Sequence, residues 1–170
     1  MLLRPARPDD LLQLAEIYNH YVLHSPATFD LEPRPLAERA DWLAHFADKG
    51  RYRLVVAEEA GAVLGYAGSL RFRAKPAYST TVETTIYCAP QATGRGIGAR
   101  LYAGLFDLLA QEDIHRIVAA YVPPNPASAA LHARFGFHPV GTFTEQGYKF
   151  GRFWDVCWME RPLRLEDPGR

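Results

Sequence analysis

The sequence predicts a mixed α/β domain, and three observations support this prediction. Short apolar runs rich in Val, Leu and aromatic residues alternate with segments of helical periodicity. The run Val82 to Tyr87 leads through the glycine turn Thr93-Gly94-Arg95-Gly96-Ile97-Gly98 into the periodic segment Ala99 to Glu112. A chain of 170 residues has the size of one domain with its own core. We therefore expect one domain over residues 1–163, followed by a polar tail at 164–170.

The first part of the chain should form a strand, two helices and a loop. Leu2 to Arg4 is the predicted strand, and Pro8 to Val22 is the first helix because Asp9 and Asp10 suit its first turn. Its expected apolar face consists of Leu11, Leu12, Ala15, Ile17 and Tyr18. Ser25 to Pro35 contains three prolines, so we expect a loop that borders a pocket. A second helix should cover about Leu36 to Asp48.

The rest of the chain should add three strands, a helix, a strand, a helix and two strands. Leu54 to Glu58 and Val63 to Phe72 flank the turn residues Glu59-Ala60-Gly61 and form a predicted hairpin. In the helix after the glycine turn, the expected core stripe is Leu101, Leu105, Leu108 and Leu109. The remaining elements are strands at Thr81–Tyr87 and Arg116–Val122, a helix at Pro126–Phe135, and strands at Val140–Tyr148 and Phe153–Glu160.

Composition excludes several classes of protein without naming one. Lys plus Arg and Asp plus Glu are 19 each, so no global basic field attracts nucleic acid. Cys88 and Cys157 do not have metal-ligand spacing, and no apolar run is long enough to span a bilayer. The N-terminus lacks the apolar region of a signal peptide. We expect a cytoplasmic protein with no metal, no nucleic-acid partner and no membrane partner.

The glycine turn is suited to binding a pyrophosphate. The first N–H groups of a helix lack internal partners and lie at the positive end of its dipole, where an anion binds readily. A P-loop is excluded because Gly98 is followed by Ala99 and Arg100 rather than by Lys and Ser or Thr. A Rossmann fingerprint is disfavoured because the glycines fall at every second position and Asp113 follows too soon.

The remaining pattern resembles motif A of the GCN5-related N-acetyltransferases (GNAT), in which such amides hold the coenzyme A pyrophosphate. The resemblance extends over residues 2–162 to the phosphinothricin and methionine sulfoximine acetyltransferases. It rests on Asn19-His20-Tyr21, Phe29 to Pro33, Thr81 to Tyr87, Leu131-His132 and Gly147-Tyr148-Lys149. It implies a mixed, mostly antiparallel central sheet flanked by helices, with acetyl-CoA as co-substrate. The motif starts at Thr93, where Gln or Arg is usual, although a start at Gln91 also satisfies the formula.

Glu83 is the predicted general base. It is the lone carboxylate in an apolar or hydroxyl-bearing strand, and partial burial would raise its pKa toward the range needed to deprotonate an amine. Strand alternation places Glu83 with Thr81 and Thr85 on one face, and the resemblance implies the same role. Two alternatives stay open: a solvent-facing Glu83, or one that only binds the substrate ammonium.

His132 is the second predicted catalytic residue, acting as general acid toward the departing thiolate or simply packing on its helix. Asn125, Ser128 and His132 share one face of that helix. Asn125 before a proline is also a good N-cap. By resemblance, the coenzyme contacts would be Thr85, Ile86, Tyr87, Thr93, Gly94, Arg95, Gly96, Ile97, Gly98, Asn125 and Ser128. A backbone amide within Thr85–Tyr87 would stabilise the oxyanion.

The predicted acceptor site contains a local cation pair. Arg73 and Lys75 lie two residues apart at the end of a predicted strand, so both side chains can point the same way and form a local anion site. The resemblance implies that basic residues there bind an acidic group of the substrate; the alternative is a solvated pair of cations. Aromatic pocket candidates are Phe29, Tyr78 and Trp154. We expect acetyl transfer to the α-amino group of a small amino acid of the phosphinothricin or methionine sulfoximine type. The alternatives are another amine acceptor or a non-catalytic acetyl-CoA sensor. The resemblance also suggests a homodimer, with Tyr148 to Trp154 either at the interface or packed inward.

Overall fold

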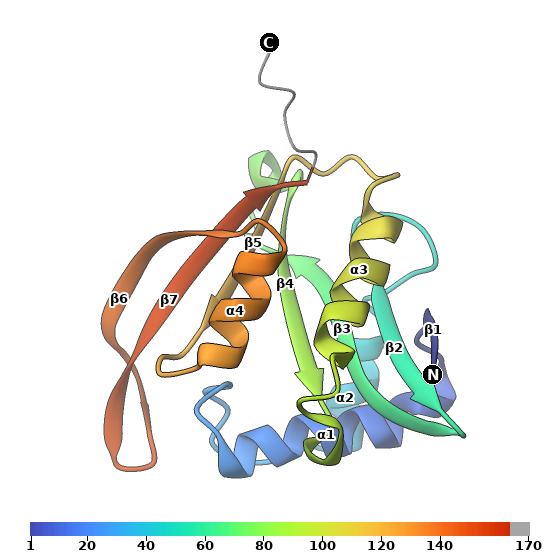
Figure 1. The fold of residues 1–170 in the computed structure, drawn as a ribbon, viewed down its shortest axis with the longest axis horizontal. Coiled ribbons are helices and arrows are strands. Elements are labelled where there is room, and N and C mark those ends of the chain that lie inside the picture. The colour runs from blue at the N-terminus through green and yellow to red at the C-terminus, as the bar shows by residue number, and fades with distance from the viewer. Residues whose placement is uncertain (164–170) are drawn as a thin grey trace.

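The computed structural model describes residues 1–163, which form a seven-stranded sheet with helices on both faces (Figure 1). The strands are β1 Leu2–Pro5, β2 Leu54–Glu59, β3 Ala62–Arg71, β4 Thr81–Cys88, β5 Arg116–Tyr121, β6 His138–Lys149 and β7 Arg152–Pro162. The helices are α1 Leu11–His24, α2 Leu36–Leu43, α3 Ile97–Leu109 and α4 Pro126–Arg134. The predicted order of elements is confirmed, while the predicted tail at 164–170 lies outside the described residues.

The sheet separates at its only parallel pair of described strands. The strand order is β1-β2-β3-β4-β5-β7-β6, and the neighbours are antiparallel except for β4 and β5. That parallel ladder joins only residues 81–83 to 116–118. Beyond it, β4 pairs with β3 and β5 pairs with β7. One edge of β4 is therefore left without a strand neighbour in the described part of the chain, in the middle of the sheet.

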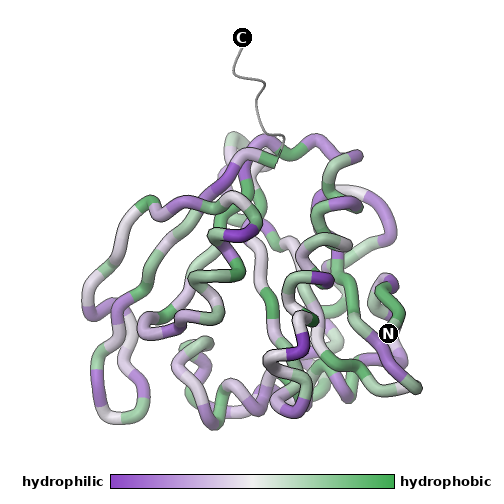
Figure 2. Tube along the Cα trace, in the orientation of Figure 1, coloured by the Kyte–Doolittle hydropathy of each residue, from purple (hydrophilic) through white to green (hydrophobic). Residues whose placement is uncertain are grey.

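Alternate residues of β3 pack against helices on opposite faces of the sheet. A Cβ atom at Gly65 would lie 3.2 Å from Cδ1 of Leu101 in α3, whereas the next residue, Tyr66, packs its ring against Trp42 of α2 at 5.7 Å. β2 and β3 are apolar and buried along most of their length, and Figure 2 shows this hydrophobic centre. In Figure 1, α3 and α4 stand in front of the sheet and α1 crosses the lower part of the picture.

The apolar face of α1 differs from the prediction. Leu12 is 56% exposed and Leu14 is fully buried. A 3-10 turn at Pro8–Asp10 precedes the helix, which begins at Leu11. Because each helical residue turns about 100°, the buried stripe through Leu14, Ile17 and Val22 leaves Leu12 on the opposite side. The prediction of Leu12 as a core residue was wrong.

Two element ends also differ. α2 ends at Leu43 rather than near Asp48, and the chain then bends back toward β2. β3 ends at Arg71, so the following basic residues lie in a connection and not on a strand. Within residues 1–163, no helix combines the length and apolar character needed to cross a membrane.

Candidate active site

A cavity of about 630 Å³ lies where β4 and β5 separate. Its walls come from four parts of the chain: residues 83–88 of β4, the turn and first residues of α3, the end of β5 with α4, and the loop after α1. We call Thr93–Gly98 the glycine wall and Pro26–Phe29 the loop wall. The unpaired edge of β4 borders the same cavity, so its amides can bind an extended ligand as a further strand would.

The glycine wall opens α3 with a left-handed backbone. Gly96 is the N-cap, with φ of 74°, and offers no side-chain cap, so the first amides of the helix remain for a ligand. Gly98 follows inside the first turn, where a Cβ would lie 3.3 Å from Cδ2 of Leu131. The helix thus begins at Ile97. This agrees with the motif starting at Thr93 rather than at Gln91, and Leu101, Leu105 and Leu109 of the expected stripe are fully buried.

Arg95, a predicted coenzyme contact, forms an ion pair with a residue of β2 in this structure. Its Nη2 lies 2.8 Å from Oε2 of Glu59, at the end of β2, and both side chains are largely exposed. The side chain is therefore directed along the surface, and Arg95 is absent from the cavity lining although its neighbours Gly94 and Gly96 line it. The local sequence could not show this pairing because Glu59 lies 36 residues earlier.

Glu83 lies half-buried in the cavity at the point where the parallel ladder ends. Burial raises the pKa of its carboxyl group, and the positive charge of Arg73 opposes this rise. A carboxylate with a raised pKa is a better proton acceptor at neutral pH than an ordinary one. This position is the one expected of the predicted general base.

Successive side chains of β4 point to opposite faces of the sheet, so the strand divides the cavity into two sides. Thr84 lies 3.4 Å from the Tyr102 hydroxyl of α3, and Ile86 faces Gly98. Tyr87 points the other way, with its ring 5.4 Å from that of Tyr18 in α1. Because alternate strand residues share a face, Glu83 lies on the same side as Tyr87, toward α1 and the loop wall.

His132 is held between two hydrogen-bonding partners and is only 2% exposed. Its Nδ1 lies 2.7 Å from the Ser128 carbonyl oxygen, so Nδ1 bears the proton and donates it. Its Nε2 lies 3.0 Å from the Tyr102 hydroxyl, which therefore donates to the ring. Burial lowers the pKa of His132, while the bond to Ser128 opposes this. The lowered pKa favours the neutral imidazole, and the fully buried Tyr102 stands beside it at the lining of the cavity.

Tyr102 is a further candidate active-site residue, which the sequence alone did not single out. It follows Leu101 of the predicted stripe and is fully buried. The available signal was the tyrosine itself, because a hydroxyl placed in an apolar core needs a polar partner. Asn125 forms the predicted N-cap, with its Oδ1 accepting from the Ser128 amide at 3.0 Å. Asn125 and Ser128 both line the cavity.

The structure places only some of the predicted acceptor-site residues in the cavity lining. Phe29 lines the cavity, whereas Arg73, Lys75 and Tyr78 are exposed in the connection after β3 and do not line it. The prediction that Arg73 and Lys75 point the same way from a strand end was wrong, because β3 ends at Arg71, before both residues. Arg73 packs over the Phe72 ring at 4.3 Å and still acts electrostatically on Glu83.

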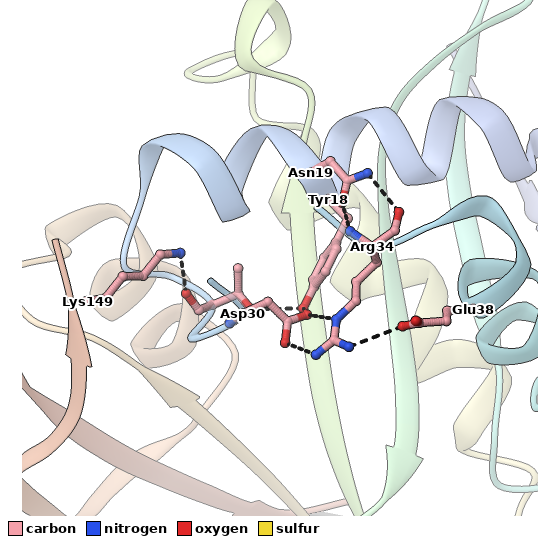
Figure 3. Close-up of polar contacts among 7 residues, drawn as sticks. Tyr18, Asn19, Asp30, Arg34, Glu38 and Lys149 are labelled. Atoms are coloured by element: carbon pink, nitrogen blue, oxygen red, sulfur yellow. Dashed lines mark hydrogen bonds and ion pairs between the residues drawn. The ribbon is translucent and has the colours of Figure 1, made fainter. Parts of the chain in front are cut away.

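The loop after α1 is fixed by a polar network that was also missed (Figure 3). The Tyr18 hydroxyl donates to Asp30 at 2.6 Å, and Arg34 pairs with the same carboxylate. Asn19 exchanges two hydrogen bonds with the Arg34 backbone, at 2.9 and 3.1 Å. Lys149 reaches the loop from β6, and Trp154 donates its indole N–H to the Lys149 carbonyl at 2.8 Å. Among residues 1–163, no cluster of metal-ligating side chains is present.

Comparison with known proteins agrees with this geometry. Residues 14–137 match the model of the acetyltransferase (GNAT) family. The chain is 58% identical over 162 residues to a phosphinothricin N-acetyltransferase of Streptomyces coelicolor, covering 94% of this chain and 95% of the relative. It is 35% identical to an L-methionine sulfoximine/L-methionine sulfone acetyltransferase of Pseudomonas paraeruginosa, covering 99% and 96% of the two chains.

A solved structure shows the same fold with a ligand bound. The phosphinothricin acetyltransferase of Sinorhizobium meliloti, in complex with acetyl-CoA, superimposes with a TM-score of 0.90 at 36% identity, covering 99% of this chain and 91% of that one. The match covers both walls of the cavity. The chain is therefore an acyltransferase that belongs to the GNAT family of acetyltransferases.

Proposed function

We propose that this enzyme transfers the acetyl group of acetyl-CoA to the α-amino group of phosphinothricin, methionine sulfoximine or a closely similar amino acid. The observation that supports it most is the 58% identity to a phosphinothricin N-acetyltransferase over nearly the whole chain. The cavity supports the same chemistry, because it joins a pyrophosphate-type glycine wall to a half-buried carboxylate. Residues 1–163 act as one catalytic domain in this proposal.

Acetyl-CoA would lie on the α3 and α4 side of β4. Its pyrophosphate would bind the amides of the glycine wall, from Thr93 to Gly98, with the Asn125 and Ser128 side chains nearby. Its extended arm would pair with the free edge of β4 at Thr85–Tyr87. One amide there would face the thioester carbonyl and stabilise the oxyanion, a contribution of about 2.7–4 kcal/mol in comparable enzymes.

The acceptor amine would approach from the opposite side, where Glu83 points. Glu83 takes a proton from the ammonium, directly or through a water molecule, and the neutral amine attacks the thioester carbon. The tetrahedral intermediate then expels the coenzyme thiolate. Tyr102 would supply a proton on that side, and the neutral His132 beside it would orient the Tyr102 hydroxyl by accepting its hydrogen bond.

The acidic group of the acceptor would be held by cations near Glu83. Arg73 is the first candidate because its charge reaches Glu83, and Lys75 follows in the same connection. Tyr78, which is uncharged, would add an apolar wall there. Phe29 of the loop wall would contact the side chain of the acceptor. These assignments predict that Arg73→Ala raises the KM for an acidic amino acid more than the KM for acetyl-CoA.

We also propose a cytoplasmic homodimer. Acetyl-CoA is an intracellular metabolite, which supports the compartment. The β6–β7 hairpin projects from the body of the molecule (Figure 1) and exposes apolar side chains that a second copy would cover. More than half of each of these side chains is exposed: Val140, Phe143, Tyr148, Phe150 and Phe153. Sedimentation of the wild type and of Phe143→Ser tests this; a monomeric wild type refutes the dimer.

The central experiment measures acetyl-CoA-dependent thiol release by the purified protein over a panel of amines. The panel contains phosphinothricin, methionine sulfoximine, methionine sulfone, ordinary amino acids, spermidine and a peptide N-terminus. We expect selective turnover of the first three compounds. Turnover of only the remaining amines would leave the family assignment unchanged and refute the proposed substrate. Tight acetyl-CoA binding with no thiol release from any compound would favour a sensor.

A further inference from the structure

The loop wall belongs to a segment with no regular structure of its own. Residues 25–35 contain neither helix nor strand, yet Pro26, Ala27, Thr28 and Phe29 line the cavity. Irregular segments have no ladder of backbone hydrogen bonds, so their carbonyls need partners elsewhere. The loop's own hydroxyls accept from two of its amides, Ser25 from Ala27 and Thr28 from Asp30, so side chains outside the loop are needed chiefly for its carbonyls.

Lys149 supplies two of those partners from the far end of the chain. Its Nζ donates to the carbonyl oxygen of Ser25 at 2.8 Å and to that of Thr28 at 2.7 Å. Figure 3 shows the Lys149 side chain directed toward this loop. The residue is only 3% exposed. Ser25 directly precedes the loop wall and Thr28 lies within it, so one ammonium group holds the backbone at both ends of this short stretch.

The free-energy cost of burying the Lys149 ammonium group indicates that this residue does more than fill space. Burying an ammonium group is unfavourable unless it is well paired, and the pKa of Lys149 is lowered by that burial, an effect the Asp30 charge opposes. The two hydrogen-bond acceptors of Nζ are neutral carbonyls rather than a carboxylate. An apolar side chain would fill the same space at lower cost if only packing were required.

A second contact between the same two segments is steric. A Cβ atom on Gly147, two residues before Lys149 in β6, would overlap the ring of Phe29. Phe29 can therefore occupy its place in the wall only because residue 147 is a glycine. The β6–β7 hairpin thus fixes the backbone of the loop wall through Lys149 and its aromatic side chain through Gly147.

The opposite end of the loop is fixed separately by α1. Tyr18 and Arg34 hold the Asp30 carboxylate, and Asn19 holds the Arg34 backbone, as Figure 3 shows. The strand β4 adds one contact, from the Tyr87 hydroxyl to the Ala27 carbonyl oxygen at 3.4 Å. Tyr87 and Glu83 lie on the same face of β4, so the loop wall borders the side on which Glu83 lies.

We propose that Lys149 is a positioning residue for the acceptor: its ammonium group holds Ser25–Phe29 in the shape that orients the amine toward Glu83. The proposal rests on the proposed function, because it takes the Glu83 side as the acceptor side. The binding of acetyl-CoA, on the other side of β4, should not depend on Lys149. Lys149 does not touch the reacting atoms; it acts through the loop wall.

The test is steady-state kinetics of Lys149→Met, which keeps an unbranched apolar side chain and removes the ammonium donors. We expect the KM for the amine accepted by the wild type to rise on the order of tenfold or more, as for a lost charged hydrogen-bond donor. The KM for acetyl-CoA should stay within about twofold of the wild-type value, because the glycine wall is untouched. Lys49→Met, at an exposed lysine in the turn before β2, is the matched control and should leave both constants unchanged.

Amide hydrogen exchange provides a readout that does not depend on activity. Lys149→Met should speed amide exchange at residues 27–30 and leave the amides of α3 as slow as in the wild type. If Lys149→Met does not fold, Gly147→Ala tests the same wall by displacing Phe29, and it should raise the amine KM while the acetyl-CoA KM stays constant.

The outcomes separate the two proposals. A wild type that acetylates no amine refutes the proposed function whatever the variants do. An active wild type whose two variants keep the amine KM and the exchange pattern unchanged refutes the role of Lys149. A rise in both Michaelis constants together would also refute it, because that result describes general loosening of the fold rather than positioning of one wall.

Discussion

The two walls of the cavity are built in different ways. The glycine wall, Thr93–Gly98, follows β4 in the chain and runs directly into α3, so its parts are sequence neighbours. The loop wall, Pro26–Phe29, takes its shape from Lys149, whose partners lie 121 and 124 residues away in the chain. A wall made of neighbours can be predicted from a motif. A wall made of distant contacts depends on the completed fold.

Glu83 stands between the two walls, and its replacement should have the largest effect on activity. Glu83→Gln keeps the size of the side chain and removes the base, so we expect kcat at saturating amine to fall roughly 10²–10⁴-fold. Both Michaelis constants should change far less. The wild-type kcat/KM should rise with pH through the raised pKa of Glu83. Unchanged turnover in the variant would show that Glu83 is not the base.

Gly96→Val should damage the glycine wall alone. The N-cap has φ of 74°, where a β-branched residue is strained by about 1–3 kcal/mol. If the turn relaxes to relieve that strain, the KM for acetyl-CoA should rise roughly 5- to 100-fold. The amine KM should not follow, which is the reverse of the result expected for Lys149→Met. An equal rise in the KM for acetyl-CoA and the KM for the amine would show that the two walls do not serve separate substrates.

Tyr102→Phe should have a smaller effect on the coenzyme side. It removes the hydroxyl that bonds Nε2 of His132 at 3.0 Å and leaves that buried nitrogen without its donor. We expect the free energy of unfolding to fall by about 1–3 kcal/mol and kcat to fall about tenfold if the hydroxyl delivers a proton to the thiolate. Denaturant unfolding and single-turnover kinetics measure the two effects separately. Lost stability with unchanged kcat would make Tyr102 purely structural.

Arg95→Ala should change little, although Arg95 lies in the middle of the glycine wall. Its side chain pairs with Glu59, and both groups are exposed, so water and salt screen the pair and it contributes little to stability. The KM for acetyl-CoA should change less than about twofold if the amides, and not this guanidinium, bind the pyrophosphate. A larger rise would mean that Arg95 leaves Glu59 when the coenzyme binds.

The smallest predicted effect is on stability against pH. Burial raises the pKa of Glu83 in the folded state, so the folded chain retains its proton at a pH where the unfolded chain has lost it. Glu83 therefore lowers the free energy of unfolding as pH rises from the ordinary glutamate pKa through the raised one. Glu83→Gln should remove this slope and be at least as stable as the wild type at neutral pH. Equal slopes in the two proteins would contradict the burial of this carboxylate.

The sequence by itself determined the order of the elements and the glycine turn before α3, and it singled out Glu83 as the predicted base. Each depends on local features: apolar periodicity, glycines before a helix, and one carboxylate in an apolar strand. The start of α3 near Ile97 also followed from local periodicity, since Leu101 and Leu105 form the buried stripe of that helix. The family resemblance added the expected ligand to that local pattern.

Only the tertiary structure decided the remaining parts of the site. The phase of α1 placed Leu14 rather than Leu12 in the core, and the end of β3 left Arg73 and Lys75 off the strand. Arg95 was bound by a distant Glu59. Side-chain partners far apart in the chain meet only when the sheet has formed, because no local preference encodes which strand will lie beside which loop. The loop wall and its Lys149 support belong to this second group.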